Sequence, residues 1–299
     1  TNPLTNADYL AMLTLPTGAT SNAAQPSDVN NLSWAFNSGS EAFNFLRQGE
    51  TLILTYTLTG TDDAATPQTG TQTVTITITG TDDAPTITQQ SGDTIAASLT
   101  EANAGLTTSG TLTVRDADLK DTVTVARTVS VGGTFTSNGE TNPLTNADYL
   151  AMLKFSGATT STLNAQPSDV NNLSWAFNSG SEAFNFLRQG ETLILTYTLT
   201  GTDDAATPQT GTQTVTITIT GTDDAPTITQ QSGDTIAASL TEANAGLTTS
   251  GTLTVRDADL KDTVTTAVSS VALSGTFTTN LQTNPLTNAD YLAMLTLPT

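Results

Sequence analysis

The chain has 299 residues, with 28 Asp and Glu against 8 Lys and Arg, and it contains neither His nor Cys. A formal net charge of −20 argues against nucleic acid or an anionic membrane surface as a partner and makes cations the natural counter-ions. Without Cys there are no disulfides or thiolate ligands, and without His the usual general base is missing, so we expect a protein that is not an enzyme.

The chain repeats itself. Residues 24–124 recur letter for letter as residues 165–265, an offset of 141. The opening segment, residues 1–13, returns at residues 141–153 and again at 283–295. A period of this length suits a single domain with its own core, so we expect a window on a longer array of tandem modules.

The predicted elements of one period are mainly strands. A short helix is expected first, because Asn6 is an N-cap candidate and Tyr9, Met12 and Leu13 then share one face. A second helix is expected where a Ser N-cap, an early Glu and a terminal Gly enclose an apolar stretch. In chain order the elements are a helix over 6–13, a strand over 32–36, a helix over 40–49, and strands over 51–59, 71–79, 94–99, 110–115 and 122–131.

Alternation of apolar residues with Thr carries the strand predictions. In residues 51–59 and 71–79 every second residue is apolar, so each strand has one buried and one soluble face. The turn-rich stretch 60–70 between them predicts an antiparallel hairpin. About seven strands per period indicate a β-sandwich, and Trp34 in its short strand is expected to pack in the core together with Phe36 and Phe43.

Three stretches resemble a known repeat. Residues 110–123 (GTLTVRDADLKDTV), residues 48–52 (QGETL) and residues 74–85 (VTITITGTDDAP) are similar to the VCBS repeat of giant RTX-type bacterial surface adhesins. The resemblance implies an all-β fold of tandem Ig-like or cadherin-like sandwiches with one or two short helices each. It also implies boundaries at the Asp-Asp-Ala-Pro junctions: part of a module over 1–83, a complete module over 84–224 and part of another over 225–299.

Acidic residues gather where these modules are expected to join. Asp-x-Asp spacing in a turn lets carboxylates converge, and clustered hard oxygen ligands suit calcium, which we expect as a structural ion. The resemblance to cadherin-like junctions points the same way, although Asp is also common in ordinary solvated turns. The candidate ligands, expected at one end of each sandwich, are Asp82, Asp83, Glu101, Asp116, Asp118 and Asp121, and in the second copy Asp223, Asp224, Glu242, Asp257, Asp259 and Asp262. Weaker candidates are Asp62, Asp63, Asp203 and Asp204.

The leading functional hypothesis is an extender module of a long extracellular adhesin or fibre on a bacterial surface, stiffened by calcium at its junctions. Its partners would be neighbouring modules of the same chain, with no nucleic acid and no membrane insertion in this segment. One alternative is a segment of an ordered filament or sheath, in which identical chains associate by strand complementation. A third is a glycan- or receptor-binding module, for which Trp34 and Trp175 are candidate stacking platforms.

Overall fold

The structure is a computed structural model that describes residues 2–16, 24–139, 141–276 and 284–297. It divides into two compact units, one formed by Thr1–Ala183 and Glu191–Thr220, the other by Phe184–Gly190 and Gly221–Thr299. We distinguish an N-terminal region (residues 2–80) and a central sandwich (residues 84–183 and 191–220) in the first unit, and a C-terminal region (residues 221–297) in the second. None of the described helices is long and apolar enough to cross a membrane.

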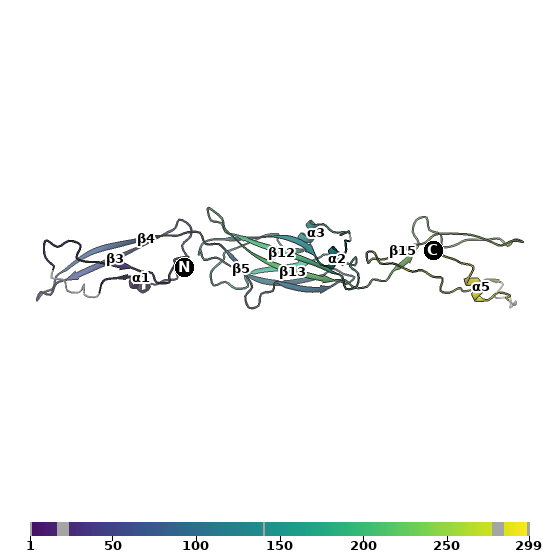
Figure 1. The fold of residues 1–299 in the computed structure, drawn as a ribbon, viewed down its shortest axis with the longest axis horizontal. Helices are drawn as coiled ribbons and strands as arrows, with labels where there is room; N and C mark the ends of the chain where they lie inside the picture. Colours follow the sequence, from purple (N-terminus) through teal and green to yellow (C-terminus); the bar gives the residue numbers. More distant parts are fainter. Residues whose placement is uncertain (1, 17–23, 140, 277–283, 298–299) are drawn as a thin grey trace. The chain divides into compact units, whose positions relative to one another are not determined.

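The central sandwich consists of two sheets (Figure 1). The five-stranded sheet has the order β10-β8-β12-β13-β6, and the four-stranded sheet has the order β5-β7-β11-β9. All pairs are antiparallel except β13 with β6. The strands are β5 (Thr86–Thr88), β6 (Ala96–Thr100), β7 (Thr107–Arg115), β8 (Val123–Gly132), β9 (Leu153–Phe155), β10 (Ser161–Leu163), β11 (Leu173–Asn178), β12 (Thr192–Thr202) and β13 (Thr210–Thr220).

The core of the sandwich lies between these sheets, where the alternating apolar residues of facing strands meet. In β12 the side chains of Leu193, Leu195 and Tyr197 are fully buried, while Ile194 and Thr196 between them stay partly exposed. Helix α3 (Asn146–Met152) begins with a capping box at Thr145. The hydroxyl of Tyr197 donates to the backbone carbonyl of Tyr149 at 2.7 Å, which ties this helix to the sheet. The other helix of the sandwich is α2 (Thr134–Ser137).

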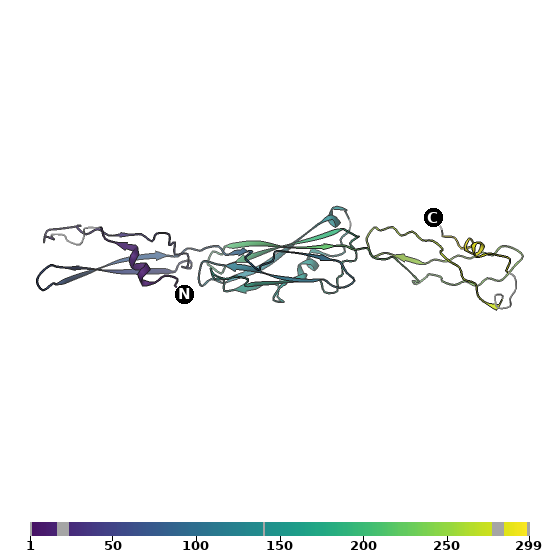
Figure 2. The same cartoon turned by 90° about the horizontal axis from the view of Figure 1, so that it is seen from below.

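The N-terminal region contains one long hairpin, β3 (Thr51–Thr61) with β4 (Thr69–Thr79), paired antiparallel along their full length. It also contains α1 (Asn6–Met12), β1 (Leu13–Thr14) and β2 (Ala35–Phe36). Helix α1 lies beside the hairpin (Figure 2), where the hydroxyl of Tyr56 donates to the carbonyl of Tyr9 at 2.7 Å. A small core around these two tyrosines, Phe43 and Leu54 holds the region together.

The C-terminal region contains few regular elements. Strand β14 (Thr227–Thr229) pairs antiparallel with β15 (Thr254–Arg256), and α5 (Asn288–Leu292) repeats the capped helix of the other two copies. Its sequence up to residue 265 is identical to that of the central sandwich, so the difference in regular structure arises from the strands available for pairing and not from local propensity.

The predicted all-β architecture is confirmed, and so are the first helix and the long antiparallel hairpin. The predicted helix over residues 40–49 is wrong, because that stretch consists of turns in which Phe43 has φ +61° and its copy Phe184 has φ +66°. A left-handed residue ends any α-helix, and here the backbone N–H of Phe43 instead bonds the Glu41 carboxylate at 2.7 Å. The short strands β1, β5, β9 and β10, and the copy of β5 in the C-terminal region, were not predicted from the sequence.

The prediction that Trp34 packs in the core is wrong for Trp34 itself, but its copy Trp175 does pack in the core. Trp175 is buried in the central sandwich, whereas Trp34 is exposed. The two residues lie in identical sequence, so the partners available to each of them decide the outcome.

Candidate metal centre

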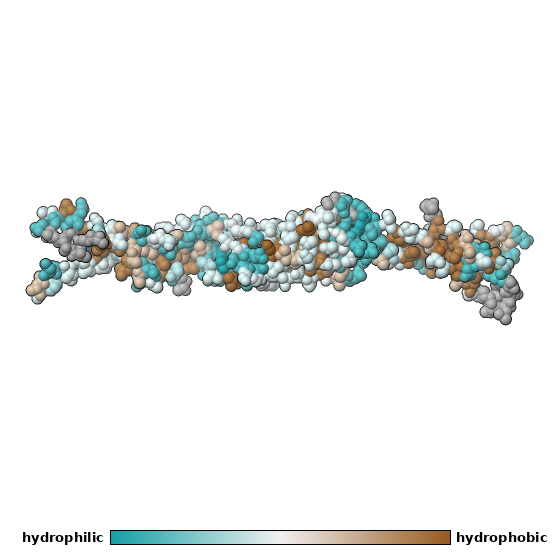
Figure 3. All heavy atoms as spheres, turned by 60° about the horizontal axis from the view of Figure 1, so that its bottom comes forward, coloured by the Kyte–Doolittle hydropathy of each residue, from teal (hydrophilic) through white to brown (hydrophobic). Residues whose placement is uncertain are grey.

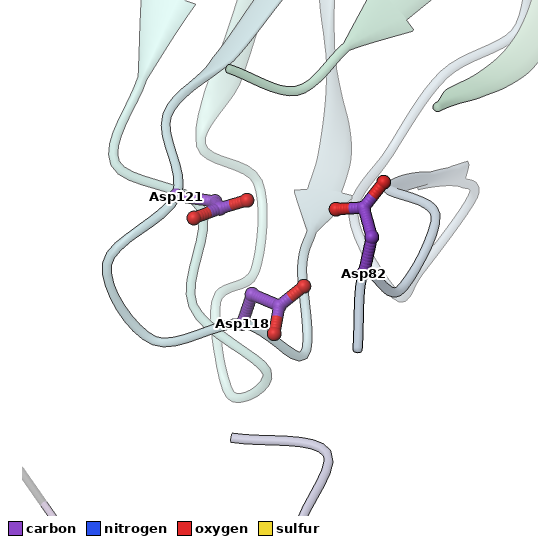
Figure 4. A group of neighbouring side chains, drawn as sticks. All are labelled: Asp82, Asp118 and Asp121. Atoms are coloured by element: carbon purple, nitrogen blue, oxygen red, sulfur yellow. The ribbon is translucent and has the colours of Figure 1, made fainter. Parts of the chain in front are cut away.

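Three carboxylates predicted to converge do so in the first unit. Asp82 follows β4 on the chain segment leading into the central sandwich, and Asp118 and Asp121 lie in the turn between β7 and β8. Figure 4 shows the three side chains facing a common space, and one ligand oxygen from each lies within 4.8 Å of the others. Two oxygens on opposite sides of one Ca²⁺ are about 5 Å apart, so these three can share an ion.

Several oxygens of this cluster are buried and have no hydrogen-bond partner among the residues that the structure describes. They comprise both carboxylate oxygens of Asp82, Oδ1 of Asp118, Oδ2 of Asp121 and Oδ2 of Asp116. Desolvating an ionised carboxylate without a compensating partner is unfavourable by several kcal/mol or more, so such groups are normally paired with a cation or bound to a metal. The arrangement therefore fits a hard divalent cation, and calcium in particular.

Local hydrogen bonds shape the turn that carries the acids. The backbone N–H of Asp118 donates to Asp116 Oδ1 at 3.1 Å, and that of Asp121 donates to the Asp118 carbonyl at 3.1 Å. The backbone N–H of Asp83 donates to Asp118 Oδ2 at 2.9 Å, which joins the incoming segment to the turn. Gln209, from the loop between β12 and β13, fixes the same segment by donating to the Asp82 carbonyl at 2.8 Å.

The electrostatics of the cluster favour either protonation or a bound cation. Burial, together with neighbouring carboxylates, raises the pKa of Asp116 to about 7 and that of Asp118 to about 6. Burial also raises the pKa of Asp121, although Arg47 acts in the opposite direction. Burial and the charge of Asp82 raise the pKa of Asp83. A cation bound among these groups would favour their ionised forms, because opposite charge lowers a carboxyl pKa.

Two residues of this site were missed by the sequence reasoning or ranked low. Arg47, from the N-terminal region, forms an ion pair with Asp121 and a second with Asp204 Oδ1 at 2.9 Å from its Nη2. Asp204 also accepts from the backbone N–H of Thr122 at 2.9 Å, a bond that lowers its pKa. The only sequence signal was the position of Arg47 just before a Gln-Gly-Glu turn, which by itself says nothing about its partners.

The same geometry is built a second time in the second unit. One ligand oxygen each from Asp223, Asp259 and Asp262 again lie within 4.8 Å of one another. The backbone N–H of Asp224 donates to Asp259 Oδ2 at 2.9 Å, and Arg188 Nε lies 2.8 Å from Asp262 Oδ1. Identical sequence thus produces the cluster twice, although Asp262 and Asp223 are more exposed than their copies.

One predicted ligand lies elsewhere in the fold. Glu101 follows β6, and its backbone N–H donates to the carbonyl of Thr220 at the end of β13, at 2.8 Å. The turn containing Asp121 is instead near Thr202, at the other end of the same sheet, since Thr202 pairs with Thr124. The expectation that all six acids meet at one end is therefore wrong for Glu101, because β6 runs parallel to β13 and carries it away.

The remaining candidates differ in their distance from the cluster. Asp116 and Asp83 border it through the hydrogen bonds described above, and in the second unit Asp257 Oδ1 likewise accepts from the Asp259 N–H at 3.2 Å. Glu242 is exposed and outside the second cluster. Asp62 and Asp63 are exposed in the hairpin loop of the N-terminal region. Asp203 is buried but binds the backbone of its own loop, at Ala205 and Gln209.

No protein-family model and no curated protein sequence matches the chain. Among solved structures, the PapD-like domain 7 of human CEP192 is similar at 10% identity over 47% of this chain and 86% of that one, with a TM-score of 0.29. A protocadherin gammaB7 EC3-6 cis-dimer structure is similar at 16% identity over 83% of this chain and 52% of that one, with a TM-score of 0.33. Mouse protocadherin-24 EC1-3 is similar at 15% identity over 79% of this chain and 65% of that one, with a TM-score of 0.32. The chain thus spans about half to two thirds of these two protocadherin chains, and similarity at this level carries no functional information.

Proposed function

We propose that this chain is an extender segment of a long extracellular surface protein, of the VCBS type found on bacteria, and that calcium stiffens the joints between its modules. The role is mechanical and not catalytic. Its partners are the neighbouring modules of the same chain. The tandem sequence identity supports this proposal, because repetition multiplies reach without requiring any one module to carry a unique binding pocket.

One observation carries the calcium part of the proposal. Buried, unpartnered carboxylate oxygens come from two sides of a joint, since Asp82 belongs to the segment leaving β4 whereas Asp118 and Asp121 belong to the central sandwich. An ion shared among them would attach that segment to the turn between β7 and β8. Removal of the ion would leave adjacent negative charges, which repel one another and loosen the joint.

The chain's own contacts support a joint that is partly formed without the ion. Besides Arg47, the ammonium of Lys120 reaches the carboxylate of Glu50 at 2.5 Å, and Gln48 Nε2 donates to Thr207 Oγ1 at 2.9 Å. These contacts are exposed and individually contribute little, at about 0–1 kcal/mol for a surface ion pair. Calcium would therefore provide most of the stiffness.

Small-angle X-ray scattering of the full chain tests this role, with calcium and after its removal by a chelator. Calcium is expected to increase the maximum dimension and to narrow the spread of conformations. The matched control is the double variant Asp118→Asn/Asp259→Asn, which should not respond to calcium. An unchanged scattering profile of the unaltered chain on calcium removal would rule out calcium stiffening, while leaving a purely structural role open.

A further inference from the structure

The modules of this chain differ from one another in two stretches only. In the central sandwich, residues 125–140 stand against residues 266–282 of the next copy, and residues 154–164 stand against residues 14–23. The rest of residues 84–224 recurs letter for letter. Whatever distinguishes one module from another in this chain therefore lies in these two stretches.

Two module types alternate along the sequence. Residues 283–299 match residues 1–17 throughout, whereas the middle copy of this segment differs from both after residue 153. We call the central sandwich type A, and the form to which residues 1–83 and 225–299 belong type B. A module of one type is thus followed by a module of the other.

The structure brings the two divergent stretches of the type A module together. One belongs to its front part (residues 84–140) and the other to its back part (residues 141–224). Strand β10, in the second stretch, pairs antiparallel with β8, which runs through the first. The differences between the types therefore meet at one place in the fold, although they lie in separate parts of the sequence.

Arg127 makes several contacts between the front part and the back part. Its Nε and Nη2 donate to the Leu150 carbonyl at 3.2 and 2.9 Å, and its Nη1 donates to the Thr159 carbonyl. The centre of its guanidinium lies 5.8 Å from the centroid of the Phe155 ring, within the range of a cation–π contact. All three partners belong to the back part, and two of them belong to its divergent stretch.

The position of Arg127 on β8 faces the interior of the sandwich. Side chains alternate along a strand, and Val125, two residues earlier on the same face, is buried. A charged group at such a place needs partners, because its desolvation is unfavourable unless hydrogen bonds compensate it. Arg127 therefore depends on the back part that supplies those carbonyl groups.

A type B back part cannot form the turn that supplies one of them. In type A, Phe155 and Ala158 exchange backbone hydrogen bonds of 2.9 and 2.7 Å, and between them Ser156 has φ +45° and Gly157 φ +85°. Type B has Pro16 at the position of Ser156. The ring of proline fixes φ near −65°, so this turn is not available to the type B sequence.

The type B front part lacks the charge that needs the turn. Val268 stands at the position of Arg127, and residues 266–282 contain neither Lys nor Arg. In the type B back part, Leu15 stands at the position of Phe155. An apolar side chain on β8 requires no carbonyl partners, so the two differences within each type suit one another.

The other strands of a module would fit either partner equally well. The sequences that form β6, β7, β11, β12 and β13 are the same in both types. Over the central sandwich, much of the surface in Figure 3 is pale, as expected of Thr-rich strands, so it offers few strongly polar or apolar groups that would tell partners apart. Exchange of elements between like domains is a characteristic failure of repeat proteins.

We infer that Arg127 and the turn over residues 155–159 match the front part of a type A module to its own back part and exclude a back part of type B. Because the types alternate, the neighbours of each module are of the other type, and exchange of strands between neighbours becomes unfavourable. The inference concerns how the strands of a module find one another, and it does not depend on the calcium proposed above.

Urea unfolding of the full chain tests this match as a thermodynamic cycle. Trp34→Phe is introduced in every variant, so that the emission of the buried Trp175 alone reports on the central sandwich. In this parent, Arg127→Val should raise the equilibrium constant of unfolding about 10- to 100-fold, because buried carbonyl groups lose a charged donor.

The second arm of the cycle replaces residues 154–164 with the sequence of residues 14–23, which gives the type A module a type B turn. In that background Arg127→Val should instead lower the unfolding constant. The charge has already lost the Phe155 ring and the Thr159 carbonyl, whereas valine is the residue that type B has at this position. If Arg127→Val raises the constant in the exchanged background as well, the inference is overturned.

Phe155→Leu provides a milder background, should the exchanged chain not fold. Since it removes only the aromatic ring, Arg127→Val should raise the unfolding constant less in Phe155→Leu than in the parent, and an equal rise would also overturn the inference. Lys154→Thr is the matched control, because Lys154 differs between the types but is exposed. The effect of Arg127→Val should be the same with and without it.

Discussion

Arg188 forms an ion pair with Asp262, with 2.8 Å between Nε and Oδ1, and Arg47 forms the equivalent pair with Asp121. The same two residue types meet in both copies although they lie far apart in the sequence. In the first unit the Asp121 side chain is fully buried, so its charge depends on what compensates it there. If a metal ion binds this cluster, Arg47 and the ion would both contact the carboxylate of Asp121.

Replacing Arg47 is therefore expected to make the protein more dependent on calcium. Arg47→Gln removes the guanidinium group that pairs with the buried carboxylate of Asp121. This loss should destabilise the metal-free protein by about 1–3 kcal/mol. Calcium should recover most of this loss, so the rise in Tm on adding calcium becomes larger than in the unaltered chain. Differential scanning calorimetry with and without calcium measures both quantities.

Lys120→Gln provides the matched control for Arg47. Its ion pair with Glu50 is mostly exposed, with 72% of the lysine side chain accessible, and its loss should change stability by less than about 1 kcal/mol. Equal effects of the two substitutions would contradict the special role of the Arg47 pair.

The two carboxylate clusters are expected to bind calcium separately. Asp118→Asn should remove the site in the first unit and Asp259→Asn the site in the second, each lowering the stoichiometry measured by isothermal titration calorimetry by one site. The reason is that each residue supplies a buried oxygen that has no hydrogen-bond partner within the described part of the chain. Asp63→Asn, in the exposed hairpin loop, should leave the titration unchanged. A titration that Asp118→Asn leaves unaltered would show that the cluster is not the site.

Stability should depend on pH in opposite directions with and without calcium. The pKa of Asp116 in the folded protein, about 7, lies above its ordinary value of 3.8, so the folded state binds the proton more tightly than the unfolded state. In metal-free protein this stabilisation is present at low pH and is lost as pH rises from about 4 to about 7. With saturating calcium, ionised carboxylates are the ligands, and stability should rise over the same range.

Urea unfolding at a series of pH values measures this dependence. Asp116→Asn should flatten the metal-free profile, since it removes the group with the largest upward pKa shift in the cluster. Profiles that run parallel with and without calcium would count against a metal bound to these carboxylates.

The hydrogen bond between Tyr197 and the Tyr149 carbonyl should stabilise the central sandwich measurably. Tyr197→Phe removes the donor and leaves a buried carbonyl unpaired, with an expected loss of about 1–3 kcal/mol in the free energy of unfolding. Tyr291→Phe, whose hydroxyl bonds the partly exposed Asn284 side chain, should cost less than about 0.5 kcal/mol. Chemical denaturation distinguishes the two, and a loss for Tyr197→Phe no larger than for Tyr291→Phe would refute the assignment.

Much of the fold could be predicted because it depends on short patterns of residues along the chain. Alternation of Leu, Ile and Val with Thr specifies the long hairpin, and Thr-Asn-Ala-Asp specifies a capped helix in all three copies. The Asp-x-Asp turn likewise closes locally, because the backbone N–H of its second Asp donates to the carboxylate of its first. The helix predicted over residues 40–49 does not form, because a composition typical of helices does not show that the backbone of Phe43 takes a left-handed conformation.

The amino-acid sequence by itself determined the repeat, the strand pattern and the Asp-x-Asp turn, since these can be recognised from near neighbours along the chain. The tertiary structure alone decided which of two identical residues is buried, that Glu101 is carried to the far end by a parallel strand, and that Arg47 meets Asp121. The physical reason is that burial and charge pairing depend on partners distant in sequence. Trp34 and Trp175 have the same neighbours along the chain and different neighbours in space.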